Sequence, residues 1–402
     1  MSPRQKRGGN QAALKAYAPT GAGTRIYLAK NVYEAALERI DFIFREFENR
    51  VIVRVSGGKD SGVLLHLATK VAEERNALPL KLYWIDQEAE WQSTVDISKA
   101  WMERDYIDPI WLQIPFKITN ATSKTDKWFH CWDPEREKDW IHPKDPLARH
   151  VNVYGTDRFK ALFAASMEHE WPHSPAASIS GVRAEESPNR RKALTFYPSY
   201  KHITWGAPEN KDLGHYNFYP LYDWSFMDVW KTIHDHKLAY NRLYDVQYRY
   251  GVHPQRMRVS SLNHEVAIQS LFLLQEFEPV TYERMTQRVD GIDMAGKFGA
   301  DDYFPHELPW MFDSWREYRD YLLAHLVDDE ARPLFARVFN EHDRKMPSYL
   351  HDDGHRVHIN SILCQDRELV KTLNWWQSPP IWQAQRENKP HWKTLEEEPI
   401  PS

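Results

Sequence analysis

Six consecutive residues combine the side chains and the backbone properties that bind an anion. They read Ser56-Gly57-Gly58-Lys59-Asp60-Ser61. The two glycines allow the backbone to approach an anion closely and to adopt positive φ. Amide groups at a helix start bind phosphate oxygens, while hydroxyls and an ammonium add hydrogen bonds and charge. The segment therefore predicts a phosphate-binding loop. Its spacing does not fit the Walker pattern, and a plain glycine turn is the alternative interpretation.

A second group of charged residues lies later in the chain. The stretch 181–192 has the pattern Gly-x-Arg-x-Glu-x-Ser-x-x-Arg, formed by Gly181, Arg183, Glu185, Ser187 and Arg190. Two arginines can grip phosphate or sulfate oxygens with paired hydrogen bonds. Glu185 would orient one of them or contact a ribose. The alternative interpretation is a cluster of charges at a helix start.

Apolar stretches that precede these polar segments predict the elements that position them. We expect strands at 51–55, 80–85, 109–114 and 177–181, and helices over 32–44 and from residue 62. Strand, glycine turn, helix and strand form the first unit of a doubly wound, mostly parallel α/β sheet. Ligands of such sheets lie at the carboxyl ends of the strands. The polar residues at 56–61, 86–90 and 181–190 each follow a predicted strand.

The rest of the chain predicts three further parts. Residues 1–25 are expected to form a flexible basic tail, and the α/β domain is expected over 26–245. An insertion or lid of about 116–171 interrupts this domain and carries a helix at 159–167. Residues 246–402 are mainly helical, with helices expected at 266–274, 315–326 and 333–339.

Composition restricts the class of protein. The 402 residues carry a net charge of −5, which argues against a general nucleic-acid coat. Two cysteines, Cys131 and Cys364, are too few for a disulfide framework or a four-cysteine iron–sulfur cluster. The sequence has no run of 18 apolar residues and no signal-peptide core. We therefore expect a soluble, cytoplasmic protein without a membrane segment.

The two charged motifs together resemble those of the phosphoadenosine phosphosulfate (PAPS) reductase family, within the PP-loop superfamily. The loop at 56–61 is similar to the signature Ser-Gly-Gly-x-Asp-Ser. Residues 219–230 resemble the family's Pro-x-x-Asp-Trp-x-x-x-Asp-Val-Trp element, and residues 241–245 its Asn-x-Leu-Tyr-Asp element. The likeness runs from about residue 32 to 252. It implies an adenine nucleotide alpha-hydrolase-like fold that binds ATP or PAPS with Mg²⁺.

The resemblance also implies roles for individual residues. Nucleotide binding is implied for Ser56, Gly57, Gly58, Lys59, Asp60, Ser61, Asp86, Gly181, Arg183, Glu185, Ser187 and Arg190. Lys59, Arg183 and Arg190 would act in catalysis by stabilising negative charge. Asp60 would cap the helix start or hold the Mg²⁺ ion. Asp86 ends a predicted strand and would contact adenosine or magnesium, whereas Glu88 and Glu90 fit a solvated helix start nearly as well.

The chemistry implied by the family depends on a cysteine that is missing here. PAPS reductases carry a reactive thiol in a short C-terminal Glu-Cys-Gly-x-His-type motif, and no such motif occurs in this sequence. We therefore expect reaction at the α-phosphorus, by nucleotidyl transfer or pyrophosphate release. Thiol-dependent reduction through Cys131 or Cys364 is one alternative. The other is a non-catalytic nucleotide sensor that acts with a DNA-binding partner.

A narrower resemblance concerns a bacterial and phage group called PAPS-reductase-like, which includes the immunoglobulin-binding regulator. It implies a protein partner with a ParB/sulfiredoxin fold. Two weaker patterns have simpler default interpretations, which are polar-surface or domain-interface contacts for the histidines and packing between the two domains for the basic and aromatic residues. His351, His355 and His358 have spacings compatible with a metal site, and so do His130, Cys131 and His142. The basic and aromatic residues between 242 and 258 could contact a nucleic acid.

Overall fold

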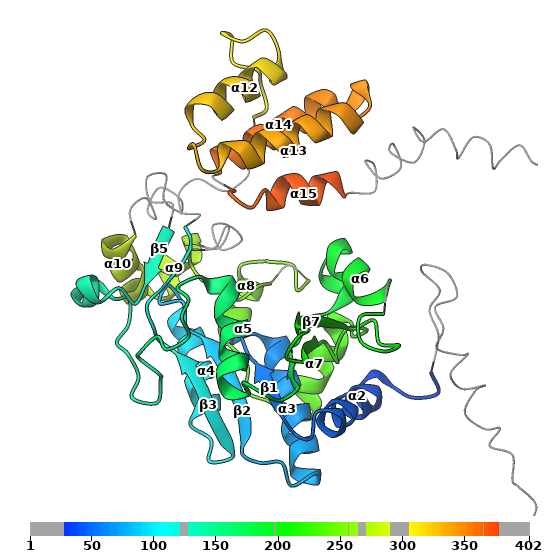
Figure 1. Cartoon of the computed structure of the whole chain (residues 1–402). Coiled ribbons are helices and arrows are strands. Elements are labelled where there is room, and N and C mark those ends of the chain that lie inside the picture. Colours follow the sequence, from blue (N-terminus) through cyan, green and yellow to red (C-terminus); the bar gives the residue numbers. More distant parts are fainter. Residues whose placement is uncertain are drawn as a thin grey trace, which may run out of the picture. The chain divides into compact units, whose positions relative to one another are not determined.

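The computed structural model describes residues 28–120, 128–196, 198–255, 257–263, 271–289, 305–364 and 366–377 (Figure 1). Contacts divide the chain into two compact units. The first unit comprises Met1–Asp86, Gln92–Phe116 and Lys144–Val259, and the second comprises Gln87–Trp91, Lys117–Pro143 and Ser260–Ser402. The first unit therefore continues beyond the boundary expected at residue 245. The tail expected at 1–25 lies outside the described residues.

A six-stranded sheet forms the centre of the first unit. Its spatial order is β3 (Ile107–Leu112), β2 (Leu80–Ile85), β1 (Val51–Arg54), β6 (Ala176–Ile179), β8 (His215–Phe218) and β7 (Gly206–Asn210). The strands from β3 to β8 pair in parallel, and β7 pairs antiparallel with β8 at one edge. This arrangement confirms the expected mostly parallel sheet, and the four strands expected from the sequence are β1, β2, β3 and β6.

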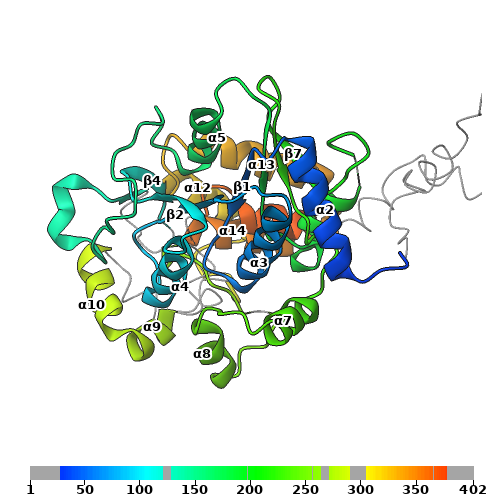
Figure 2. The ribbon, with the colours of Figure 1, turned by 90° about the horizontal axis from the view of Figure 1, so that it is seen from below.

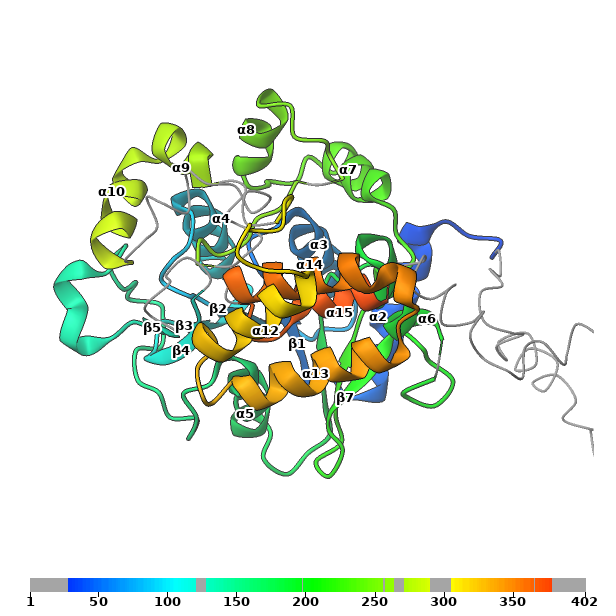
Figure 3. The same ribbon diagram turned by 90° about the horizontal axis from the view of Figure 1, so that it is seen from above.

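Helices cover both faces of this sheet (Figures 2 and 3). One face carries α3 (Lys59–Glu74), α4 (Gln92–Met102) and α7 (Phe226–Asp235), and α2 (Val32–Glu46) lies beside α3. The other face carries α5 (Phe159–Glu170). The alternation of side chains along β1 explains the two layers. Val51 and Val53 enter the hydrophobic core, whereas the Arg54 guanidinium lies 3.8 Å from the centre of the Phe163 ring on α5.

The spatial order of the strands reverses at β1. β2, which follows β1 along the chain, lies on one side of it, and β6 lies on the other. In doubly wound sheets, ligands bind outside the carboxyl ends of strands at such a reversal. The residues directly after β1 and β6 belong to the two charged motifs. The fold therefore brings residues 56–61 and 181–190 together.

The second unit is mainly helical in its described part. Its strands are β4 (Phe116–Thr119), whose first residue is assigned to the first unit, and β5 (Trp128–Cys131). Its 3₁₀ helices are η1 (Pro134–Asp139) and η5 (Ser348–Leu350). Its α-helices are α9 (Leu271–Phe277), α10 (Pro279–Arg288), α12 (Trp315–His325), α13 (Arg332–Lys345), α14 (His351–Leu363) and α15 (Val370–Trp376). The helices expected at 315–326 and 333–339 are α12 and part of α13. Of the helix expected at 266–274, residues 266–270 lie outside the described part, and the remainder falls in α9. No described helix has both the length and the apolar composition needed to span a membrane.

The histidines of α14 take part in a buried polar network. His358 Nε2 lies 3.0 Å from His342 Nδ1 on α13, and His355 Nε2 donates to Asp343 Oδ1 at 3.1 Å. His351 Nε2 donates instead to the Met346 carbonyl. In the part of the chain that the structure describes, no three His, Cys, Asp or Glu side chains form a metal-binding group. His355 and His358 are buried, so a polar surface does not describe these two residues.

This network predicts a loss of stability in mild acid. Burial lowers the pKa of His342 from 6.5 to about 4, so the unfolded chain binds a proton more readily than the folded chain. The contribution of neutral His342 to the free energy of unfolding is therefore complete above pH 6.5. It decreases by ~2 kcal/mol as the pH drops from 6.5 through 4. We expect His342→Phe to reduce the change in unfolding temperature between pH 7.5 and 4.5. The exposed His325 provides the control, since His325→Gln should leave this change intact, and an unaltered pH dependence in His342→Phe would refute the assignment.

Candidate functional site

The loop at 56–61 has the backbone geometry that its two glycines allow. Gly57 adopts a φ of 69°, and Gly58 is the extended residue that precedes the first turn of α3. A Cβ on Gly57 would lie 2.6 Å from Thr94 Cγ2, which excludes any larger residue without a shift of α4. The first amide groups of a helix lack intrahelical partners and can bind an anion. In this loop the Lys59 amide donates to the Tyr244 hydroxyl and the Ser56 amide to Ser61 Oγ, so an anion at the carboxyl end of β1 would use the other amides.

The two serines of the loop hold its ends together. Ser61 Oγ donates to the Gly58 carbonyl at 3.1 Å and accepts a hydrogen bond from the Ser56 amide at 3.2 Å. The two hydroxyl oxygens are also 3.1 Å apart. Ser56 and Ser61 therefore stabilise the shape of the loop, whereas their expected contacts with a nucleotide stay a prediction.

The capping role expected for Asp60 is wrong. Gly58 is the N-cap of α3, it makes no side-chain cap, and Asp60 lies within the first turn. The Asp60 carboxylate lies 3.1 Å from Lys59 Nζ through Oδ2 and accepts from Arg183 Nε through Oδ1. Because both oxygens are engaged by cations, this arrangement does not fit Asp60 as a direct Mg²⁺ ligand. Its role here is to link the two motifs.

Gly181 permits the close approach of those motifs. A Cβ at this position would lie 2.9 Å from both the carbonyl carbon and the carbonyl oxygen of Asp60, and 3.2 Å from the Ser61 amide nitrogen. These are backbone atoms, so no side-chain rotation can relieve the contact. The chain that leaves β6 therefore passes directly over the first turn of α3 because residue 181 lacks a side chain.

Arg183 is the central side chain between the two motifs. Its side chain is 3% exposed, and besides Asp60 it donates through Nη1 to Glu185 Oε2 at 2.8 Å. Glu185 also accepts from the Phe226 amide at 2.6 Å, and Glu186 accepts from the Arg183 amide. Glu185 thus orients the arginine, which is one of the two roles expected for it.

Arg190 lies seven residues after Arg183, in α6 (Pro188–Thr195). Ser187 is the N-cap of this helix, where its hydroxyl accepts from the Arg190 amide, and Pro188 occupies the first helical position. The Arg190 guanidinium pairs with Glu186, and 47% of the side chain is exposed. Desolvation, followed by repulsion from Arg258, lowers its pKa. Arg190 is therefore partly accessible to a ligand, unlike Arg183.

Two residues join this site that were not assigned to it from the sequence. Tyr244, on α8 (Leu243–Arg249), is buried, and its hydroxyl accepts from the Lys59 amide at 3.2 Å while Lys59 Nζ lies 5.0 Å from the centre of its ring. Arg258 is close enough to lower the pKa of Lys59 and of Arg190. Tyr244 lies in the Asn-x-Leu-Tyr-Asp element, which was a signal of its importance. Arg258 lies among the basic and aromatic residues between 242 and 258, which were considered for contact with a nucleic acid and not for this site.

Four cations converge at the site, and three carboxylates offset most of their charge. Lys59 is 3% exposed, and burial lowers its pKa, an effect that Asp60 opposes. Lys59, Arg183 and Arg190 pair with Asp60, Glu185 and Glu186, whereas Arg258 adds a further positive charge. A phosphate bound among these cations would add negative charge that their excess favours. The arrangement can therefore hold a polyphosphate and stabilise charge that develops on it.

Asp86 lies at the same edge of the sheet but is occupied by structural hydrogen bonds. It is fully buried at the end of β2, and its Oδ2 accepts from Gln113 Nε2 at 2.8 Å and Trp111 Nε1 at 3.2 Å. Its contact with a nucleotide stays a prediction. The solvated helix start considered for Glu88 and Glu90 is wrong, because both are buried and belong to the second unit.

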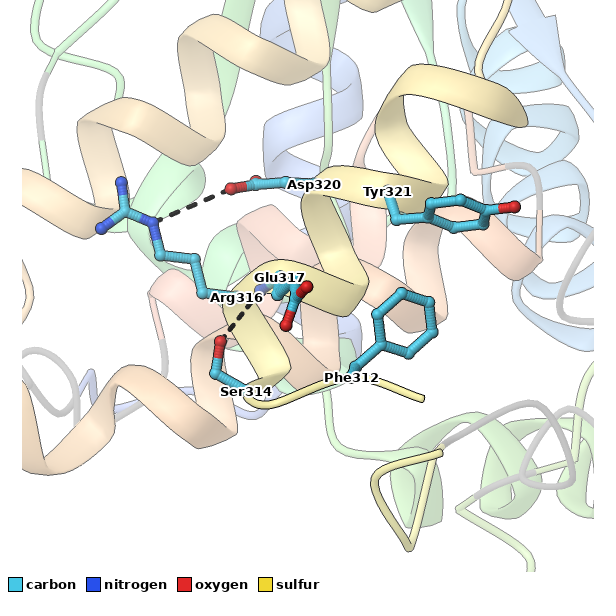
Figure 4. Close-up of a pocket in the computed structure, with 6 residues that line it drawn as sticks. All are labelled: Phe312, Ser314, Arg316, Glu317, Asp320 and Tyr321. Carbon is cyan, nitrogen blue, oxygen red and sulfur yellow. Dashed lines mark hydrogen bonds and ion pairs between the residues drawn. The ribbon is translucent and has the colours of Figure 1, made fainter. Parts of the chain in front are cut away.

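A shallow surface pocket lies elsewhere, on α12 of the second unit (Figure 4). Phe312, Ser314, Arg316, Glu317, Asp320 and Tyr321 line its volume of about 450 Å³. Ser314 caps α12 through the Glu317 amide, and Arg316 Nε lies 3.8 Å from Asp320 Oδ2. Its polar groups are thus satisfied by one another. We place the candidate site at the charged loops instead, because their side chains converge from separate elements.

Comparisons with known proteins show the family of this chain. A model of the phosphoadenosine phosphosulfate reductase domain matches residues 50–250, and a model of a domain of unknown function, DUF3440, matches residues 251–356. The uncharacterised protein YbdN of Escherichia coli (strain K12) is 31% identical over 351 residues, which are 81% of each chain. An adenosine 5′-phosphosulfate reductase of Bacillus cereus (strain 03BB102) is 24% identical over 54% of this chain and 76% of its own.

Comparison with solved structures gives low similarity scores, as with PAPS reductase from Candida auris in a phosphate complex, which has a TM-score of 0.29 and 15% identity over 56% of this chain and 94% of that one. Candida glabrata FMN adenylyltransferase has a TM-score of 0.33 and 14% identity over 55% and 62% of the two chains. The reductase-domain model matches half of the present chain and includes both charged motifs. This chain therefore belongs to the phosphoadenosine phosphosulfate reductase domain family.

Proposed function

We propose that the protein binds an adenine nucleotide, ATP or PAPS, at the loop 56–61 and catalyses reaction at the α-phosphorus. One observation carries this proposal. The loop after β1 meets Arg183 from the loop after β6 at the reversal of strand order, and Asp60 joins the two. An anion bound there lies among amide donors and converging cations. Such a site is suited to a reaction at phosphorus in which a negatively charged group leaves.

In the reaction with ATP, a nucleophile forms a bond to the α-phosphorus. The bond from that phosphorus to the bridging oxygen breaks, and pyrophosphate leaves with the electron pair. Lys59 and the loop amides would hold the pyrophosphate, because the ammonium and the first turn of α3 lie side by side. Arg183 and Arg190 would stabilise charge on the equatorial oxygens. Positioning and charge stabilisation provide most of the rate in reactions of this kind.

The burial of Cys131 favours this chemistry over reduction through that thiol. Cys131 is 1% exposed, and a thiol that attacks bound PAPS must be accessible. Cys364 Sγ donates to Asn360 Oδ1 and accepts from Lys371 Nζ. The partner with a ParB/sulfiredoxin fold stays a prediction from the resemblance.

Replacing both cysteines tests the choice between the two reactions. We expect Cys131→Ala combined with Cys364→Ser to keep nucleotide turnover within about twofold of the unchanged protein, because neither thiol takes part. Turnover of ATP and of PAPS would be followed by product chromatography, with sulfite measured in the presence of a thiol reductant. Sulfite formation that disappears in the double variant would establish reduction and exclude the proposed reaction.

A further inference from the structure

A short segment leaves the nucleotide-binding unit directly after β2. Gln87–Trp91 belongs to the second unit, although Asp86 before it and Gln92 after it belong to the first. Within the second unit, the Ala89 carbonyl accepts from the Leu262 amide at 2.6 Å and from Ser261 Oγ at 2.9 Å. Residues close in sequence to the charged loops are therefore held by residues from the C-terminal part of the chain.

The strongest attachment of this segment is a buried ion pair. Glu88 is fully buried, and Arg288 on α10 is 4% exposed in its side chain. Glu88 Oε1 accepts from Arg288 Nε at 2.7 Å, and Glu88 Oε2 accepts from Arg288 Nη2 at 3.2 Å and from the Trp132 amide. Burial raises the pKa of Glu88, and Arg288 opposes that change. Removing Arg288 would leave the carboxylate buried without its counter-charge.

Arg288 is itself held rigidly. Its Nη2 also donates to the His130 carbonyl at 2.5 Å, and its guanidinium lies 4.7 Å from the centre of the Phe129 ring. Glu88 adopts a positive φ of 63°, an uncommon conformation for a residue other than glycine. Such a conformation persists where surrounding contacts determine it. Here the contacts are those that Arg288 and Trp132 make with the Glu88 side chain.

The same segment leads straight into a helix that braces the phosphate-binding loop. α4 begins at Gln92, and Thr94 in its first turn is the residue that fills the space beside Gly57. Asn241 Nδ2 donates to Thr94 Oγ1 at 3.0 Å and to the Gly57 carbonyl at 3.4 Å. A shift at the start of α4 would therefore change the support of Gly57. Chain continuity therefore connects α4 to the segment that Glu88 and the Ala89 carbonyl attach to the second unit.

From this chain of contacts, we propose that Arg288 is a positioning residue for the nucleotide loop. By holding Glu88, it fixes the start of α4 and thereby keeps Thr94 against Gly57. Glu88 lies in the region matched by the reductase-domain model, and Arg288 lies in the region matched by DUF3440. A role of the C-terminal region is thus to keep the loop in its anion-binding shape. This inference rests on the proposed nucleotide site.

The test compares ATP affinity among variants of the full chain. Arg288→Ala should weaken ATP binding at least tenfold in calorimetric titrations performed where circular dichroism shows folded protein. Arg288→Lys should recover part of the loss, because an ammonium restores the charge but not the paired geometry. Arg284→Ala is the matched control, since Arg284 is an exposed arginine on the same helix, and its affinity should stay within about twofold. Unchanged ATP affinity in folded Arg288→Ala would overturn the proposal.

A second measurement does not depend on ATP binding or on the Arg288 variants. Glu88→Gln keeps the shape of the side chain and removes its charge. Hydrogen exchange should become faster in residues 92–98 of this variant and stay unchanged in the rest of the sheet. Unaltered exchange in 92–98 would overturn the inference. Faster exchange in a protein whose unchanged form fails to bind ATP would support the positioning role and reject the proposed function instead.

Discussion

Replacing Lys59 with methionine should lower turnover of the bound nucleotide about 100- to 1000-fold, because a preorganised charge is lost where the leaving group is held. Methionine keeps most of the buried volume, so packing around Tyr244 is preserved. Asp60 retains Arg183 as a partner, which limits damage to the link between the motifs. The measurement is steady-state turnover with ATP and PAPS, together with equilibrium binding of each nucleotide.

The control for this variant lies on the same helix. Lys70 is an exposed residue in the last part of α3, whereas the loop lies at the start of that helix. Lys70→Met removes an equal charge. Its turnover should stay within about twofold of the unchanged protein. If Lys59→Met also turned over normally, the loop lysine would have no part in the reaction and the proposed mechanism would be wrong.

A single added methyl group at Gly181 should disable the site. In Gly181→Ala, the new Cβ would meet the Asp60 carbonyl group at 2.9 Å, so the segment after β6 must move away from α3. That shift separates Arg183 from Asp60 and disturbs the anion site. We expect nucleotide affinity to fall at least tenfold and the free energy of unfolding to fall by about 1–3 kcal/mol. Calorimetry and denaturant titration measure the two effects.

Gly155→Ala separates this steric effect from the general cost of replacing a glycine. Gly155 lies in the same unit, and a Cβ there would meet nothing within 4 Å, although its φ of 68° makes alanine strained. This control should lose stability without losing nucleotide affinity. Normal affinity in Gly181→Ala would show that the close approach of the two motifs is not needed for binding.

The core of the fold was predictable because its strands are short, apolar and buried. Val51–Arg54 and Leu80–Ile85 carry alternating or continuous hydrophobic residues that bury against helices on both faces. The edge strand β7 and its neighbour β8 were missed because they lack such apolar runs. Gly206–Asn210 contains Gly, Pro and Asn, and His215–Phe218 includes His and Asn, so pairing within the sheet rather than local preference forms these strands.

The candidate site was predictable where its residues are adjacent in sequence. Residues 56–61 and Arg183 fall on the two loops that meet where the strand order reverses. They were found because the residues of each motif are close in sequence and stay close in the fold. The assignment of Asp60 as a cap was wrong because Gly58 is the N-cap of α3. The Asp60 carboxylate instead accepts a hydrogen bond from Arg183, which lies 123 residues away in sequence. Glu88 was misread as solvated because its partner Arg288 lies 200 residues further on. Such long-range pairs leave no local signal.

The most direct test of the central claim asks which bond of ATP is broken. Purified protein would be incubated with ATP labelled at both the α- and γ-phosphorus, with deproteinised cell extract as a source of acceptors, alongside Lys59→Met. The proposed function predicts released pyrophosphate and an AMP-containing product, both absent from the variant. ADP with free phosphate would contradict reaction at the α-phosphorus. Tight ATP binding without any product would contradict catalysis and support the nucleotide-sensor alternative.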